Sequence, residues 1–71
     1  MSKWKYNPDN FKYELADDMR AFYEAYEKGP KSISIYGLVE NIHYSAKESM
    51  KFREISPELC AEIQAYFWRF V

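Results

Sequence analysis

The side chains with the clearest chemical potential in this sequence are its lone histidine, His43, and its lone cysteine, Cys60. A histidine that acts as a general base needs an orienting carboxylate and a nearby nucleophile. The helical neighbours of His43 are instead Glu40 and Lys47, three and four residues away, which allows a local ion pair. We therefore expect a structural or interface role for His43.

Cys60 has no neighbouring histidine and no second cysteine for a CxxC pair or a disulfide. It stands in the first turn of a predicted helix, where a thiol pKa can be lowered and the sulfur made reactive. The default for such a residue is an inert, half-buried thiol. With no His/Cys ligand set and no catalytic pair, the sequence predicts no metal, no cofactor and no small-molecule substrate, and we expect a protein that is not an enzyme.

The charges are nearly balanced, since ten Lys/Arg stand against eleven Asp/Glu for a net charge of −1. A strong overall attraction to nucleic acid or to an acidic membrane is not expected at this charge. One basic cluster, Lys47, Lys51 and Arg53, is of the kind that contacts phosphates. Glu48 and Glu54 interrupt it. A small nucleic-acid-binding regulator that uses these three basic residues is the alternative functional prediction.

Aromatic residues are in surplus, with seven Tyr, five Phe and two Trp in 71 residues. A domain of this size buries only about 60% of the surface of its unfolded chain, so some rings are expected in a binding surface. Tyr and Trp are enriched at binding hot spots. The rings that point away from the predicted helix faces, together with one neighbour, are the predicted partner-binding residues: Tyr13, Tyr44, Phe67 and Trp68.

Three helices must position these residues, at about 10–28, 34–50 and 57–70, because apolar residues recur there every three or four positions. Asp9 or Asn10 is the predicted N-cap of the first helix, and Gly29 is expected in the left-handed position after its last turn. The apolar face of the first helix is Phe11, Leu15, Met19, Phe22, Tyr23 and Tyr26.

The second helix is expected to be capped by Ser32 or Ser34, and Gly37 within it to allow close approach of another backbone. Its apolar face is Ile35, Leu38, Val39, Ile42, His43, Ala46 and Met50. The third helix begins with Ser56 as N-cap and Pro57 at the first helical position. Its apolar face is Leu59, Ile63, Tyr66 and Phe70, flanked by Cys60 and Phe67.

The fold prediction is a single all-α domain over 1–71, a small three-helix bundle with a short N-terminal arm. Trp4 and Tyr6 are expected to dock the arm on the bundle, since disordered tails seldom carry such rings. In the connection after the second helix, Phe52 and Ile55 are expected to point inward. The alternative is an α+β fold in which 32–36 and 51–55 pair as short strands.

The leading functional prediction is a non-enzymatic helical protein–protein interaction module, a regulator or an inhibitor, that binds a protein partner or self-associates. In size, aromatic density and lack of catalytic groups the chain resembles the small accessory proteins of phages and mobile elements. No apolar run approaches the roughly 20 residues needed to span a bilayer, and the N-terminus lacks the apolar core of a signal peptide. A cytoplasmic location is therefore expected, with no membrane partner.

Overall fold

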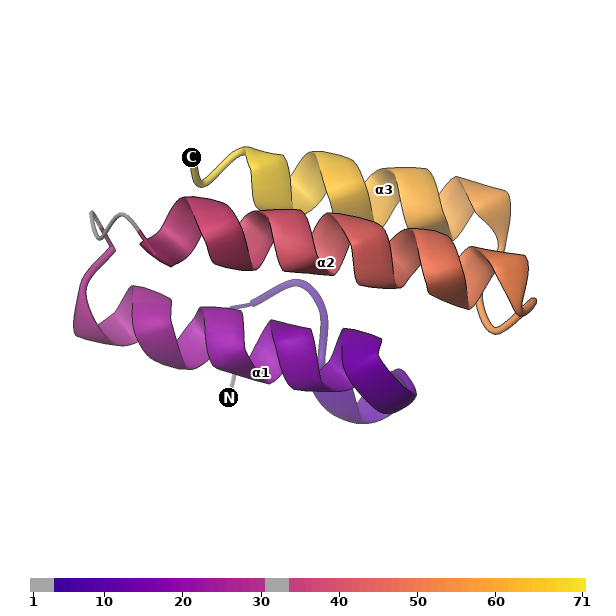
Figure 1. Ribbon diagram of the computed structural model, residues 1–71, viewed down its shortest axis with the longest axis horizontal. Coiled ribbons are helices and arrows are strands. Elements are labelled where there is room, and N and C mark those ends of the chain that lie inside the picture. Colours follow the sequence, from indigo (N-terminus) through magenta and orange to yellow (C-terminus); the bar gives the residue numbers. More distant parts are fainter. Residues whose placement is uncertain (1–3, 31–33) are drawn as a thin grey trace.

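The computed structural model of the protein describes residues 4–30 and 34–71. Within them the chain forms a short 3-10 turn, η1 (Pro8–Asn10), and three helices, α1 (Tyr13–Lys28), α2 (Ser34–Lys51) and α3 (Pro57–Trp68). Figure 1 shows α2 lying between α1 and α3. The predicted three-helix bundle is confirmed.

The alternative strand pairing is wrong for the residues that the structure describes. Residues 34–36 are helical, and 51–55 form the end of α2 and a turn. Residues 32 and 33 lie outside the described ranges, and with them the predicted cap Ser32. Ser34 is itself the first residue of α2.

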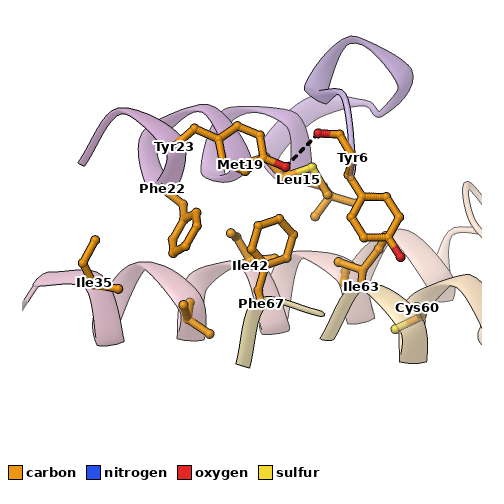
Figure 2. Close-up of a cluster of buried hydrophobic side chains, with 12 residues drawn as sticks. Tyr6, Leu15, Met19, Phe22, Tyr23, Ile35, Ile42, Cys60, Ile63 and Phe67 are labelled. Carbon is orange, nitrogen blue, oxygen red and sulfur yellow. Dashed lines mark hydrogen bonds between the residues drawn. The ribbon is translucent and has the colours of Figure 1, made fainter. Parts of the chain in front are cut away.

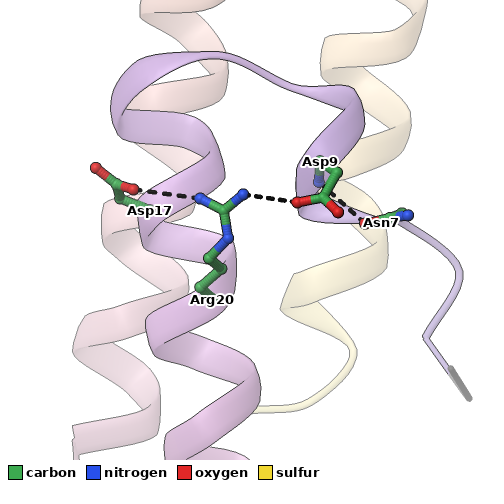
Figure 3. A network of polar contacts seen from close by, with 4 residues as sticks. All are labelled: Asn7, Asp9, Asp17 and Arg20. Atoms are coloured by element: carbon green, nitrogen blue, oxygen red, sulfur yellow. Dashed lines mark hydrogen bonds and ion pairs between the residues drawn. The ribbon is translucent and has the colours of Figure 1, made fainter.

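The start of α1 differs from the prediction, because neither Asp9 nor Asn10 caps it. Asn7 caps the preceding η1 turn instead, accepting a hydrogen bond from the Asp9 backbone N–H at 3.0 Å. The Asp9 carboxylate pairs with the Arg20 guanidinium at 2.8 Å, as Figure 3 shows. The helix then begins three residues later, after Lys12, whose side chain provides no capping bond. Asp9 thus forms an ion pair with a residue eleven positions later and does not cap the N-terminus of α1.

The other helix ends follow the sequence more closely. Ser56 caps α3 by accepting a hydrogen bond from the Leu59 N–H at 3.1 Å, with Pro57 at the first helical position, as predicted. Gly29 does end α1, but in an extended conformation (φ −167°) rather than a left-handed one. Gly37 faces open space, with no atom within 4 Å of where a Cβ would lie, so the predicted close approach is wrong.

The core is built from all three helices and the arm (Figure 2). On α3 the innermost residues are Cys60, Ile63 and Phe67, while Tyr66 and Phe70 are only half-buried. The prediction that Phe67 belongs to a partner-binding surface is therefore wrong, since its side chain is 0% exposed. Two sets of apolar residues in and just after α3 both have helical spacing: Leu59, Ile63, Tyr66 and Phe70, and Cys60, Ile63 and Phe67. The sequence pattern alone does not show which set faces the core.

The arm packs where α1 and α3 meet. No Cα of α1 lies within 8 Å of a Cα of α3, and the two helices meet through large side chains, with the Phe22 and Phe67 rings 5.2 Å apart. The Trp4 ring stacks on Tyr23 at 4.5 Å and meets Phe70 edge-on at 5.5 Å. Tyr6 is buried, and its ring lies 5.2 Å from that of Tyr66. Hydrogen bonds fix the arm on both sides: Tyr23 Oη donates to the Tyr6 carbonyl at 2.7 Å (Figure 2), and the Lys5 N–H donates to Tyr66 Oη at 3.2 Å. The predicted docking of the arm is confirmed.

None of the helices in the described ranges has the length and apolar character needed to cross a bilayer.

Candidate protein-binding surface

An open groove lies where α1 begins and α2 ends, with a volume of about 690 Å³. We call it the α1/α2 groove. Its residues from the α1 side are Lys12, Tyr13, Glu14 and Leu15, and those from the α2 side are Ser45, Glu48, Ser49, Phe52 and Glu54.

The groove exists because α2 carries small side chains on the face that meets the first turns of α1. Ser45 and Ser49 are both buried and stand one turn apart. The Ser45 hydroxyl donates a hydrogen bond to the carboxylate of Asp18, which ties α2 to α1 below the groove. Leu15 supplies buried apolar surface beside the serines. The floor of the groove is thus part of the folded core, and it is already formed before any partner arrives.

Two aromatic rings line the groove and are largely exposed, Tyr13 at 75% and Phe52 at 74%. Tyr13 lies outside the core, as its place off the α1 apolar face predicts. Phe52 was predicted to point inward, and that prediction is wrong. The half-buried Ile55, packed against the core, occupies the inward position of this connection, as predicted for it. Phe52 continues the Ser45 and Ser49 face of α2 one turn past the core.

The backbone next to Phe52 is held by a helix-ending turn. The Arg53 N–H donates to the Met50 carbonyl at 3.0 Å, and the Glu54 N–H donates to the Ser49 carbonyl at 2.8 Å. This is the Schellman arrangement, with Arg53 in the left-handed position usually taken by glycine (φ 62°). Tyr13 also has a left-handed backbone (φ 54°). Such a conformation costs a non-glycine residue about 1–2 kcal/mol.

The rim of the groove is acidic. Glu14 stands on the α1 side, and Glu48 and Glu54 on the α2 side, against Lys12 alone among the lining residues. Glu48 is 3.7 Å from the ammonium of Lys51. Among the ion pairs of residues 4–30 and 34–71, none includes Glu14 or Glu54. Two carboxylates on opposite sides of the groove are therefore left without a paired cation among the described residues.

A second group of rings lies along α2 and α3, and we call it the His43 cluster: Tyr36, His43, Tyr44 and Trp68. The Trp68 ring packs on those of Tyr36 at 5.6 Å and His43 at 6.0 Å, and His43 packs on Tyr44 at 5.5 Å. Trp68 Nε1–H donates a hydrogen bond to His43 Nδ1 at 3.3 Å, and Trp68 is half-buried. Tyr44 is 62% exposed. His43 thus serves to hold Trp68 in place.

The predicted partners of His43 are replaced by others. Gln64 donates from Nε2 to the His43 carbonyl at 3.2 Å. In the described part of the chain, no ion pair joins His43 to Glu40 or Lys47. The bond to Trp68 spans 25 residues and the bond to Gln64 spans 21, so helical spacing on α2 alone could not reveal either.

The four predicted partner-binding residues consequently fall in three different places. Tyr13 lines the α1/α2 groove, Tyr44 and Trp68 belong to the His43 cluster, and Phe67 is in the core. The sequence did not single out Phe52, because an aromatic residue in a connection usually covers the core. The signal that could have indicated the groove is the pair of serines one turn apart on an otherwise apolar helix face.

Cys60 is a core residue, 4% exposed. Burial raises the pKa of its thiol, and the positive charge of Lys47 offsets only part of this effect. The direction is opposite to that expected for a reactive thiol at a helix N-terminus. Within residues 4–30 and 34–71, no three His, Cys, Asp or Glu side chains come together in a group that could hold a metal ion.

The basic cluster of the sequence is divided in the structure. Lys51 lies 3.7 Å from the Glu48 carboxylate, and Arg53 stands in the turn between Phe52 and Glu54 of the acidic rim. Lys47 is close enough to Cys60 to influence its thiol. Nucleic-acid binding by these residues stays a prediction.

Comparisons with protein-family models, with curated proteins and with solved structures find no match to this chain.

Proposed function

We propose that this protein is a non-enzymatic protein-binding module whose partner docks in the α1/α2 groove against Tyr13 and Phe52. The observation that carries the proposal is that these two rings are 75% and 74% exposed beside a groove, while other rings complete the core. Exposed rings of this size are the anchors that protein interfaces bury most often.

The energetics favour a protein partner. Complete burial of an aromatic side chain contributes about 1.5–3 kcal/mol, so two rings supply a useful part of a binding free energy. The floor of the groove is fixed by the Ser45–Asp18 hydrogen bond, so little ordering of this face is needed on binding. A groove open between two helix ends encloses little of a small molecule, whereas a segment of another protein can lie along it.

A regulatory or inhibitory role fits a domain whose described surface offers a docking face and no group of catalytic side chains. The module would act by occupying a surface of its partner. We place this activity in the cytoplasm, where a free thiol such as that of Cys60 stays reduced.

The proposal is tested with a double variant, Tyr13→Ala with Phe52→Ala, compared with Tyr44→Ala as a matched control. Tyr44 has a similarly exposed ring outside the groove. Quantitative pull-down from the source cells and light scattering of the pure protein are measured for each. Loss of the bound partner, or of self-association, in the double variant alone is the expected result.

Two results would overturn the groove as the binding surface. In one, Tyr44→Ala abolishes binding and the groove variant does not, which would assign the partner to the His43 cluster. In the other, the protein binds a DNA or RNA oligonucleotide with steep salt dependence and loses it when Lys47, Lys51 and Arg53 are replaced by alanine, which would support the nucleic-acid alternative.

A further inference from the structure

We infer that the partner segment of the α1/α2 groove is basic, with one apolar side chain seated between Tyr13 and Phe52 and Lys or Arg residues on both sides of it. This inference rests on the proposed function and adds the chemistry of the partner. It is carried by the arrangement of charge around the groove: each wall has a carboxylate without an ion pair among the described residues, Glu14 beside Lys12 on the α1 side and Glu54 on the α2 side, and the rings of Tyr13 and Phe52 lie in the same lining.

The apolar position follows from the middle of the groove. Tyr13 and Phe52 line it, and Leu15 contributes buried apolar surface at its floor. An aliphatic or aromatic side chain placed here would lose water contact together with both rings. A polar anchor would find the buried serines as partners, but the Ser45 hydroxyl is already engaged with Asp18.

The basic positions follow from the walls. The carboxylates of Glu14 and Glu54 are on opposite sides of the groove and pair with no Lys or Arg of the described chain. The C-terminal end of α2 lies at the same wall as Glu54, and its dipole also favours a cation. A guanidinium or ammonium over the exposed faces of Tyr13 or Phe52 gains a cation–π contact as well.

The same charges disfavour two other occupants. A second copy docked groove to groove across a twofold axis would bring acidic rims together, which costs free energy through like-charge repulsion. A nucleic acid would bring phosphates next to Glu14 and Glu54. Both remain distinguishable outcomes of the experiment below.

The test is selection of a random-peptide library, displayed on phage, against the immobilised full-length chain. Enriched peptides are expected to carry Lys or Arg on both sides of an apolar residue. Synthetic copies are then titrated by fluorescence anisotropy. Glu14→Gln and Glu54→Gln are each expected to weaken Kd roughly two- to fivefold, the range of a partly exposed ion pair. Raising the salt from about 50 to about 500 mM should weaken it further. Glu27→Gln, an exposed carboxylate at the far end of α1, is the matched control.

The outcomes separate this inference from the function on which it rests. If enriched peptides lack basic residues, or ignore Glu14→Gln and Glu54→Gln, while Tyr13→Ala with Phe52→Ala abolishes binding, the groove stands and the basic partner is wrong. If the peptides bind that double variant as tightly as the wild type, or if no peptide is enriched, both are wrong. Dimerisation of the pure chain that the double variant abolishes would make a second copy the occupant and overturn the basic-segment inference.

Discussion

Two regions between helices differ in this bundle, since one is filled with side chains and the other is open. The gap between α1 and α3 is filled by rings of the two helices, such as Phe22 and Phe67, and by the arm. The Trp4 ring of the arm contacts four others, those of Phe22, Tyr23, Tyr26 and Phe70. The groove between the start of α1 and the end of α2 is also bordered by rings. Within the described ranges, neither Tyr13 nor Phe52 contacts another ring.

The difference shows what limits burial in so short a chain. An aromatic ring is buried only where the chain supplies neighbours on both of its sides. The arm places Trp4 and Tyr6 between α1 and α3, which supply those neighbours. At the α1/α2 groove the α2 residues opposite the first turns of α1 are small serines, and within the described ranges the rings of Tyr13 and Phe52 stay largely uncovered. The two most exposed rings of the described chain are thus left beside a floor that belongs to the folded core.

The largest expected effect is on the closed gap. Trp4→Ala removes a half-buried ring that packs on four others, and it should lower the free energy of unfolding by about 2–4 kcal/mol. Urea denaturation followed by circular dichroism measures this. Because a small domain has only about 5–15 kcal/mol in total, Trp4→Phe serves as a milder variant with a smaller loss. A loss below about 0.5 kcal/mol for Trp4→Ala would mean that the arm does not close this gap in solution.

The next effect concerns the hydrogen bond that fixes the arm. Tyr23→Phe deletes the donor to the Tyr6 carbonyl and should cost about 1 kcal/mol. Tyr6→Phe is the matched control, because the Tyr6 hydroxyl is buried and has no hydrogen-bond partner among residues 4–30 and 34–71. Its removal should be neutral or stabilising. Equal losses in the two variants, measured by the same denaturation, would contradict this assignment.

The same tyrosine predicts a pH dependence. Burial, and then the neighbouring Tyr66 and Tyr6, raise the pKa of Tyr23 above its ordinary value of 10.0. The unfolded chain therefore releases this proton at lower pH than the folded chain does. Stability is full below about pH 10 and falls as the pH rises above it. Cys60, whose pKa burial also raises, adds a decline that begins near its ordinary value of 9.0. Tyr23→Phe should flatten the decline above pH 10, and an unchanged slope would contradict the assignment.

The closed side of the molecule was largely predictable from the sequence. The apolar periodicity of three segments gives the bundle, and Ser56 with Pro57 marks the start of α3, because both signals are local. The docking of Trp4 and Tyr6 also follows from their presence on a short arm. What was missed here is long-range: Asp9 pairs with Arg20 instead of capping α1.

The groove was less predictable, for a physical reason. Whether Phe52 or Ile55 turns inward depends on where α2 stops, and that depends on Arg53 taking a left-handed backbone, which arginine does not signal. Phe67 was misassigned because two interleaved apolar spacings share Ile63. The groove forms because the side chains of Ser45 and Ser49 are small. The sequence could not show this, because it does not reveal that α1 lies opposite these two serines.

A smaller effect tests how the open side is held. Arg53→Gly relieves the left-handed backbone while keeping the two hydrogen bonds of the turn, so it should stabilise the fold by about 0.5–1 kcal/mol, less what glycine adds to the entropy of the unfolded chain. Thermal denaturation measures the shift. A destabilised Arg53→Gly would mean that the Arg53 side chain, and not the turn, holds Phe52 beside the groove.

The smallest expected effect bears most directly on the comparison. Phe52→Ala should change the free energy of unfolding by no more than about 0.5 kcal/mol, because an exposed ring without ring contacts contributes little to folding. Ile55→Ala, three residues away in the same connection but packed against the core, should cost about 1–2 kcal/mol. Denaturation of the two variants side by side gives the answer. If Phe52→Ala costs as much as Ile55→Ala, the ring covers the core in solution and the groove is closed. If Phe52→Ala leaves the free energy of unfolding unchanged, the Phe52 ring does not contribute to folding and is available to bind a partner.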